Sequence, residues 1–98
     1  MEEERRGRVL VVDDDPDIRQ VLCLALRAEG YEVRSAGDGG DALQQLDGWN
    51  PGMILLDWMM PGLDGAAFLT TWSTDARAAA TPVVVLSAGR WWPGGWLP

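Results

Sequence analysis

Acidic and hydroxyl side chains directly follow three short apolar runs, at residues 9–12, 53–56 and 82–86. The side chains are those of Asp13, Asp14, Asp57 and Ser87. Runs this short and this rich in β-branched residues are typical of strands buried on both faces of a sheet. Ligands of parallel α/β sheets gather at the carboxyl ends of the strands, so we expect these side chains to share one crevice if the three strands are neighbours.

Carboxylates gathered in one crevice repel each other. Two unit charges about 4 Å apart cost about 4 kcal/mol at an effective dielectric constant of about 20. Protonation or a divalent cation relieves this repulsion, and Mg²⁺ prefers an octahedron of oxygen ligands that includes some of its waters. Asp13 or Asp14, together with Asp57, a backbone carbonyl and waters, would suit such an ion.

A metal beside Asp57 would make this residue a plausible nucleophile toward phosphorus, because carboxylates form aspartyl phosphates. The cation would offset negative charge on the phosphoryl oxygens. The hydroxyl of Ser87 could donate a hydrogen bond to one of them. The pattern therefore favours a phosphoacceptor site.

The rest of the sequence supplies elements that position these residues. Residues 31–36 alternate weakly and are expected to form a further strand. Three helices are expected, each preceded by a capping aspartate and each with apolar residues at helical spacing. The caps are Asp15, Asp38 and Asp64, and the apolar positions are Ile18, Val21, Leu22 and Ala25, then Ala42, Leu43 and Leu46, then Phe68, Leu69 and Trp72. Strands alternating with helices predict a parallel sheet with right-handed crossovers.

Composition limits the classes of protein to consider. The 98 residues suit one small domain, and the net charge of −7 argues against direct binding to nucleic acid. All eight basic residues are arginine. The single cysteine, Cys23, excludes an internal disulfide and is expected to be a small core residue. No apolar run is long enough to cross a membrane, so we expect a cytoplasmic protein.

Three segments together resemble the receiver domain of bacterial response regulators. Residues 11–16 (Val-Val-Asp-Asp-Asp-Pro) resemble the first strand and acidic pair of that family, and residues 55–65 resemble its phosphoacceptor strand and the following loop. Residues 83–88 resemble the strand that ends in a small hydroxyl residue. The resemblance covers roughly residues 7–88, and three motifs in order are more specific than one.

The resemblance implies a flavodoxin-like fold with strand order 2-1-3-4. It implies that Asp13, Asp14, Asp57 and the backbone carbonyl of Met59 bind Mg²⁺. Asp57 would accept a phosphoryl group from a sensor histidine kinase or a phosphotransfer protein, and Ser87 would contact that group and move with it as a switch. The protein would be a regulatory phosphoacceptor rather than an enzyme.

The chain also departs from the family. Receiver domains have a fifth strand that carries a lysine and an aromatic switch residue, and this chain contains no lysine. We find no counterpart of the family's fourth helix, fifth strand or fifth helix, so residues 1–88 are expected to be an incomplete receiver domain and residues 89–98 an irregular, tryptophan-rich tail. The strand at 83–86 would then be a bare edge through which two copies could pair.

Two alternatives remain beside the phosphoacceptor. The absent lysine favours a truncated receiver that acts as an interaction module without being phosphorylated. The pair Asp13 and Asp15 resembles the nucleophile and acid of Asp-x-Asp phosphatases, but those enzymes need a lysine and a larger chain. A calcium loop starting at Asp13 fails, because Ile18 replaces the required glycine and Leu24 replaces the required glutamate.

Overall fold

The computed structural model describes residues 7–57, 65–86, 91–92 and 95–96. The described elements are β1 (Arg8–Val12), α2 (Pro16–Ala28), β2 (Glu32–Ala36), α3 (Gly39–Gln45), β3 (Met53–Asp57), α4 (Gly65–Trp72), the 3₁₀ turn η1 (Ala78–Ala80), β4 (Val83–Leu86), β5 (Trp91–Trp92) and β6 (Gly95–Trp96). Through β4 this order alternates strand and helix as the sequence predicts. No helix in this part of the chain is long and apolar enough to span a membrane.

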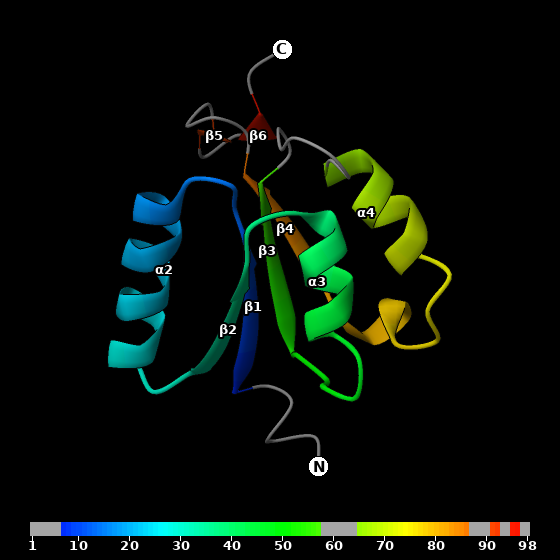
Figure 1. Cartoon of the computed structure of the whole chain (residues 1–98), viewed down its shortest axis with the longest axis horizontal. Coiled ribbons are helices and arrows are strands. Elements are labelled where there is room, and N and C mark those ends of the chain that lie inside the picture. The colour runs from blue at the N-terminus through cyan, green and yellow to red at the C-terminus, as the bar shows by residue number, and fades with distance from the viewer. Residues whose placement is uncertain (1–6, 58–64, 87–90, 93–94, 97–98) are drawn as a thin grey trace.

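Four strands form one parallel sheet in the order β2-β1-β3-β4 (Figure 1), which confirms the predicted topology. The two central strands are β1 and β3, and Val12 lies opposite Leu56 in their register. The next residue of each strand is therefore Asp13 and Asp57, at the carboxyl edge of the sheet. The register thus brings two of the predicted site residues side by side.

Capping aspartates begin α2 and α3 as expected. The carboxylate of Asp15 accepts hydrogen bonds from the backbone N–H groups of Asp17 (2.9 Å) and Ile18 (3.3 Å). Asp38 accepts one from the backbone N–H of Asp41 at 2.7 Å. These bonds satisfy donors that the first turn of a helix leaves without a partner. The predicted cap of the third helix, Asp64, lies outside the described residues.

Helices cover both faces of the sheet (Figure 1). On one face α3 and α4 pack on β1 and β3, and the buried core there includes Leu10, Leu56, Leu46, Phe68 and Trp72. On the other face α2 packs over β1 and β2, with Cys23 buried in the smaller core as the sequence predicts. The apolar positions predicted for the second and third helices do face the sheet or each other.

The apolar positions of α2 behave differently. Leu22, Cys23 and Leu26 contact the sheet side, but Ile18 is 50% exposed and Val21 is 64% exposed. Ala25 is exposed as well, so the prediction that Ile18, Val21 and Ala25 belong to the packed stripe is wrong, and of the four predicted positions Leu22 packs there. The reason is that α2 carries apolar residues on most of its circumference, so periodicity alone does not show which stripe packs.

Beyond β4, the described residues of the expected irregular tail form a short antiparallel ladder. Trp91 lies opposite Trp96 and Trp92 opposite Gly95. This pairing departs from the prediction of no regular structure, and aromatic residues do favour strands. Among the described strands β4 pairs only with β3.

Arg77 joins η1 to the connection between α3 and β3. Its guanidinium donates to three acceptors in that connection: the main-chain oxygens of Leu46 and Trp49, each at 2.9 Å, and Oδ1 of Asn50 at 2.8 Å. It also pairs with Asp75 at 2.9 Å and lies 4.9 Å from the centre of the Trp72 ring. Hydrogen bonds from the side chain and backbone of Arg77 lower the pKa of Asp75 to about 2.

Candidate metal and phosphoacceptor site

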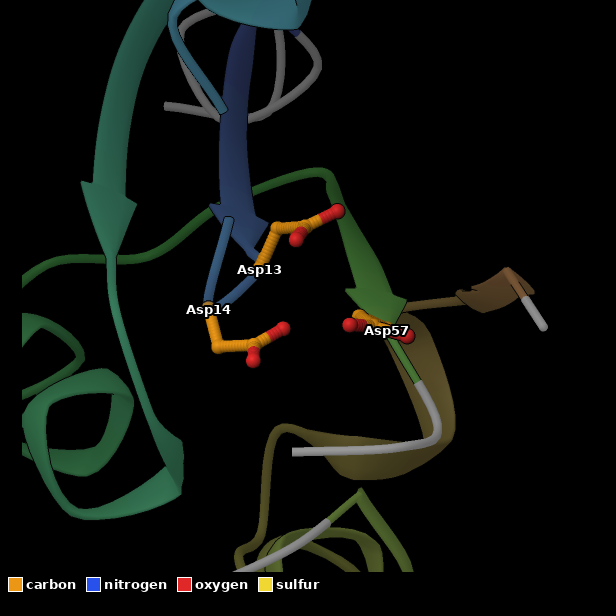
Figure 2. Close-up of side chains that lie close together, drawn as sticks. All are labelled: Asp13, Asp14 and Asp57. Carbon is orange, nitrogen blue, oxygen red and sulfur yellow. The ribbon is translucent and has the colours of Figure 1, made fainter. Parts of the chain in front are cut away.

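Three carboxylates converge at the carboxyl edge of the sheet. One oxygen from each of Asp13, Asp14 and Asp57 lies within 4.8 Å of the others. Figure 2 shows the three side chains extending from the ends of β1 and β3 toward a shared space. The structure therefore brings together the three acidic residues that the sequence singles out.

Asp13 is held in place by its surroundings. It is only 5% exposed, and its backbone N–H donates to the carbonyl oxygen of Ala36 at 3.1 Å. Its Oδ1 accepts a hydrogen bond from the backbone N–H of Asp15 at 2.9 Å. Its main-chain oxygen accepts one from Nη1 of Arg19 at 2.7 Å. The carboxylate is therefore oriented before any ligand arrives.

The electrostatics of Asp13 favour a cation. Burial raises the pKa of its carboxyl above the usual 3.8, and the negative charges of Asp14 and Asp15 raise it further. The hydrogen bond from Asp15 and the positive charge of Arg19 oppose this shift. A buried carboxylate beside other acids is costly to keep ionised, and a divalent ion removes that cost.

The carboxylates open into a pocket of about 440 Å³. Its lining combines four aspartates with three apolar residues: Asp13, Asp14, Asp15, Asp57, Ile18, Leu22 and Leu86. A water molecule occupies about 30 Å³ in the liquid, so the pocket has room for a hydrated cation and a phosphoryl group. Carboxylate oxygens are the ligands that Mg²⁺ prefers, so this donor set fits that ion.

Other parts of the predicted site are not described. The carbonyl of Met59 and the hydroxyl of Ser87 lie outside the described residues, and their roles stay predictions. Sequence reasoning also missed Arg19, whose guanidinium supports the main chain at Asp13 and lies 3.3 Å from where a Cβ would sit on Gly37. Arg19 lies on the same side of α2 as Leu22, Cys23 and Leu26, which face the sheet. The sequence alone does not show which side of this helix packs, so it gave no signal for Arg19.

Comparisons with known proteins agree with this geometry. The family model of the response regulator receiver domain matches residues 9–90. The DNA-binding response regulator MtrA of Mycolicibacterium smegmatis is 39% identical over 83 residues, which are 85% of this chain and 35% of MtrA. The phosphate regulon transcriptional regulatory protein PhoB of Escherichia coli (strain K12) is 38% identical over 81 residues, 83% of this chain and 35% of PhoB. The chain thus spans about a third of the length of these relatives.

Solved structures are similar as well. The chemotaxis protein CheY4 of Vibrio cholerae superposes with a TM-score of 0.78 at 32% identity, over 82% of this chain and 67% of CheY4. The N-terminal domain of a response regulator receiver protein from Methanoculleus marisnigri JR1 also gives 0.78, at 35% identity, over 90% of this chain and 72% of that one. The flavodoxin-like fold, the strand order and the matched family model lead to one conclusion. This chain belongs to the response regulator receiver domain family.

Proposed function

We propose that this chain is the phosphoacceptor of a two-component phosphorelay, in which Asp57 takes a phosphoryl group from the phosphohistidine of a histidine kinase or a phosphotransfer protein. The observation that carries this proposal is the meeting of Asp13, Asp14 and Asp57 at the ends of two neighbouring parallel strands. The relatives described as DNA-binding are longer proteins, and the net charge of −7 supports no direct nucleic-acid contact by this chain.

In the proposed reaction a carboxylate oxygen of Asp57 attacks phosphorus. The new O–P bond forms as the N–P bond of the phosphohistidine breaks, and the departing imidazole keeps the electron pair and takes up a proton. Mg²⁺, when bound, would offset charge on the phosphoryl oxygens. Asp13 and Asp14 would hold the ion, with Asp13 prealigned by its bonds to Asp15 and Arg19.

The remaining contacts rest on the family resemblance. The backbone carbonyl of Met59 would complete the metal ligands, and Ser87 would donate to a phosphoryl oxygen and move as the switch. Because the chain has no lysine, it lacks a charge-assisted contact worth about 1.5–3 kcal/mol to the phosphoryl group. We therefore expect phosphorylation of the 98-residue chain to be slow.

The same absence of lysine supports a second candidate. In it the chain is an interaction module that binds a partner without being phosphorylated. The two candidates differ in one measurable property, which is whether Asp57 gains a phosphoryl group.

Incubation with acetyl phosphate and Mg²⁺, followed by intact-mass spectrometry, tests the proposal. We expect the mass of one phosphoryl group to be added to the wild-type chain and to the exposed control Asp47→Asn, but not to Asp57→Asn and not when Mg²⁺ is chelated. No added mass in a sample with native circular dichroism would contradict phosphoacceptor function and favour the interaction module.

A further inference from the structure

A groove separate from the phosphoacceptor pocket lies between α2 and β2. Its volume is about 380 Å³, and it shares no described lining residue with the pocket of the three carboxylates. The residues that line it are Pro16, Arg19, Gln20, Cys23, Leu24, Arg27 and Ser35. These lining residues include two arginines and no acidic side chain, although the chain as a whole has 15 acidic and 8 basic residues. The groove therefore gathers positive charge on an acidic protein.

The two arginines of this groove lack the partners that the other described arginines have. Arg8 and Arg77 form salt bridges, at 3.6 and 2.9 Å, and the guanidinium of Arg34 lies 4.7 Å from the centre of a tryptophan ring. Arg19 and Arg27 form no salt bridge with any residue in the described part of the chain. An anion bound between them would supply the missing negative charge.

Each of the two guanidiniums is anchored by a hydrogen bond to the main chain. Nη1 of Arg19 donates to the carbonyl oxygen of Asp13 at 2.7 Å, and Nη2 of Arg27 donates to that of Val33 at 3.1 Å. A guanidinium has five N–H donors in a planar fork, so each arginine can still bind a carboxylate through two others. The anchoring bonds restrict the side chains beforehand and reduce the cost of ordering them around a ligand.

The spacing of the two arginines limits the length of the ligand. They are eight residues apart on α2, which corresponds to about 12 Å along the helix. Their anchoring points give a similar value. The backbone N–H of Asp13 bonds to the carbonyl oxygen of Ala36 at 3.1 Å, and Ala36 lies three residues, or about 10 Å, beyond Val33 on β2. A phosphate ion or a short dianion therefore reaches one arginine but not both.

The wall between the two arginines is mostly apolar. Cys23 and Leu24 lie between them along α2, and Ser35 lies between their anchoring points along β2. A volume of 380 Å³ holds roughly a dozen water molecules at about 30 Å³ each, which matches a linear ligand of about as many non-hydrogen atoms. Such a wall suits a chain of methylene groups.

We propose that this groove binds a linear dicarboxylate whose two carboxylates are about 10 Å apart. One carboxylate binds Arg19, the other binds Arg27, and the methylene chain packs along Cys23 and Leu24. The proposal does not depend on phosphorylation of Asp57, because the two pockets have no lining residue in common. Arg27 is exposed, and salt screens exposed charges within about 8 Å at physiological ionic strength. We therefore expect a dissociation constant on the order of 1 mM that rises with added salt.

Titration of the ¹⁵N-labelled 98-residue chain with azelate, followed by NMR, tests the proposal. Azelate is a linear dicarboxylate of nine carbons, and with C–C bonds of about 1.5 Å its carboxylates lie about 10 Å apart when extended. We expect saturable shifts of the backbone amide signals of the lining residues. Succinate is too short to span the arginines and nonanoate has one carboxylate, so each should bind at least about fivefold more weakly than azelate.

The variant Arg27→Gln removes one end of the site. Arg27 is exposed and gives up one described hydrogen bond, so this variant should fold, which circular dichroism would verify. We expect it to bind azelate at least about fivefold more weakly and to lose the preference for azelate over succinate. The matched control Arg34→Gln removes the same charge at an exposed position of β2 outside the groove, and it should bind azelate as the wild type does.

Three results would overturn the proposal. The first is the absence of saturable shifts at the lining residues up to about 20 mM azelate. The second is equal binding of succinate and azelate, which would mean that the arginines attract anions one at a time. The third is equal weakening by Arg27→Gln and Arg34→Gln, which would show an effect of net charge alone.

Discussion

Replacing Asp13 by asparagine should have opposite effects on the metal-free and the Mg²⁺-loaded protein. Asparagine keeps the volume of the side chain and the oxygen that accepts the hydrogen bond from Asp15, but it removes the buried negative charge. Without metal this charge is unfavourable, because burial and the charges of Asp14 and Asp15 raise the pKa of Asp13. We therefore expect Asp13→Asn to stabilise the metal-free fold.

The magnitude follows from the spacing of the carboxylates. Oxygens of Asp13, Asp14 and Asp57 lie within 4.8 Å of one another. A pair at this distance repels by about 1 kcal/mol at the dielectric constant of water and by about 3 kcal/mol at an effective value of about 20. Asp14 is exposed to water, so we expect a gain of about 1 kcal/mol in the free energy of unfolding.

The metal-bound protein should respond in the other direction. Losing one of three carboxylates weakens the attraction for a divalent cation by roughly 3 kcal/mol, which is a rise in dissociation constant of about 100-fold. Mg²⁺ should then raise the free energy of unfolding of the wild type but not of Asp13→Asn. Urea denaturation with and without Mg²⁺ measures both effects.

The exposed Asp47→Asn serves as the charge-matched control and should change neither quantity. A variant Asp13→Asn that is less stable without metal, and that is still stabilised by Mg²⁺ as strongly as the wild type, would refute the reasoning. Such a result would mean that Asp13 serves the fold and not the ion.

The other predictions concern the contacts of Arg77 and the response to pH. Arg77→Met removes five side-chain hydrogen bonds but keeps an apolar stem over Trp72, so urea denaturation should show a loss of about 3 kcal/mol, whereas the exposed Arg27→Met should lose less than about 1 kcal/mol because it gives up one bond. A similar loss for both variants would contradict the role assigned to Arg77. The pKa of Asp75 falls from 3.8 to about 2, so its contribution to stability is complete above 3.8 and disappears as the pH drops toward 2. Asp75→Asn should therefore flatten the acid limb of a stability-against-pH curve, and an unchanged limb would disprove the assignment. The pKa of Asp13 shifts the other way. Because this pKa is raised, the contribution of Asp13 to stability declines as the pH rises above 3.8. The difference in the free energy of unfolding between wild type and Asp13→Asn should therefore grow as the pH rises.

Part of the site depends only on residues close together in the chain. Asp13 and Asp57 each follow an apolar run of strand length, and Asp15 and Asp38 each precede a helical pattern, so sequence spacing predicts their positions. Parallel order follows as well, because strands that alternate with helices have few other connections available. The placement of the carboxylates at one edge is a consequence of that order.

Other features depend on contacts between distant segments. Arg77 bonds to residues about thirty positions earlier in the chain, and no local pattern indicates such partners. The support of Asp13 by Arg19 depends on how α2 sits on the sheet. The raised pKa of Asp13 depends on its burial, which is a property of the packed molecule.

The amino-acid sequence by itself therefore determined the alternating elements through β4, their parallel order and the acidic residues at the strand ends, because local propensity and strand alternation are encoded over a few residues. Only the tertiary structure decided which side of α2 packs. Apolar residues surround most of this helix, and the stripe of Leu22, Cys23 and Leu26 is buried because the sheet meets that side. Val21 and Leu24 do not face the sheet, and no described part of the chain covers them, so they remain exposed.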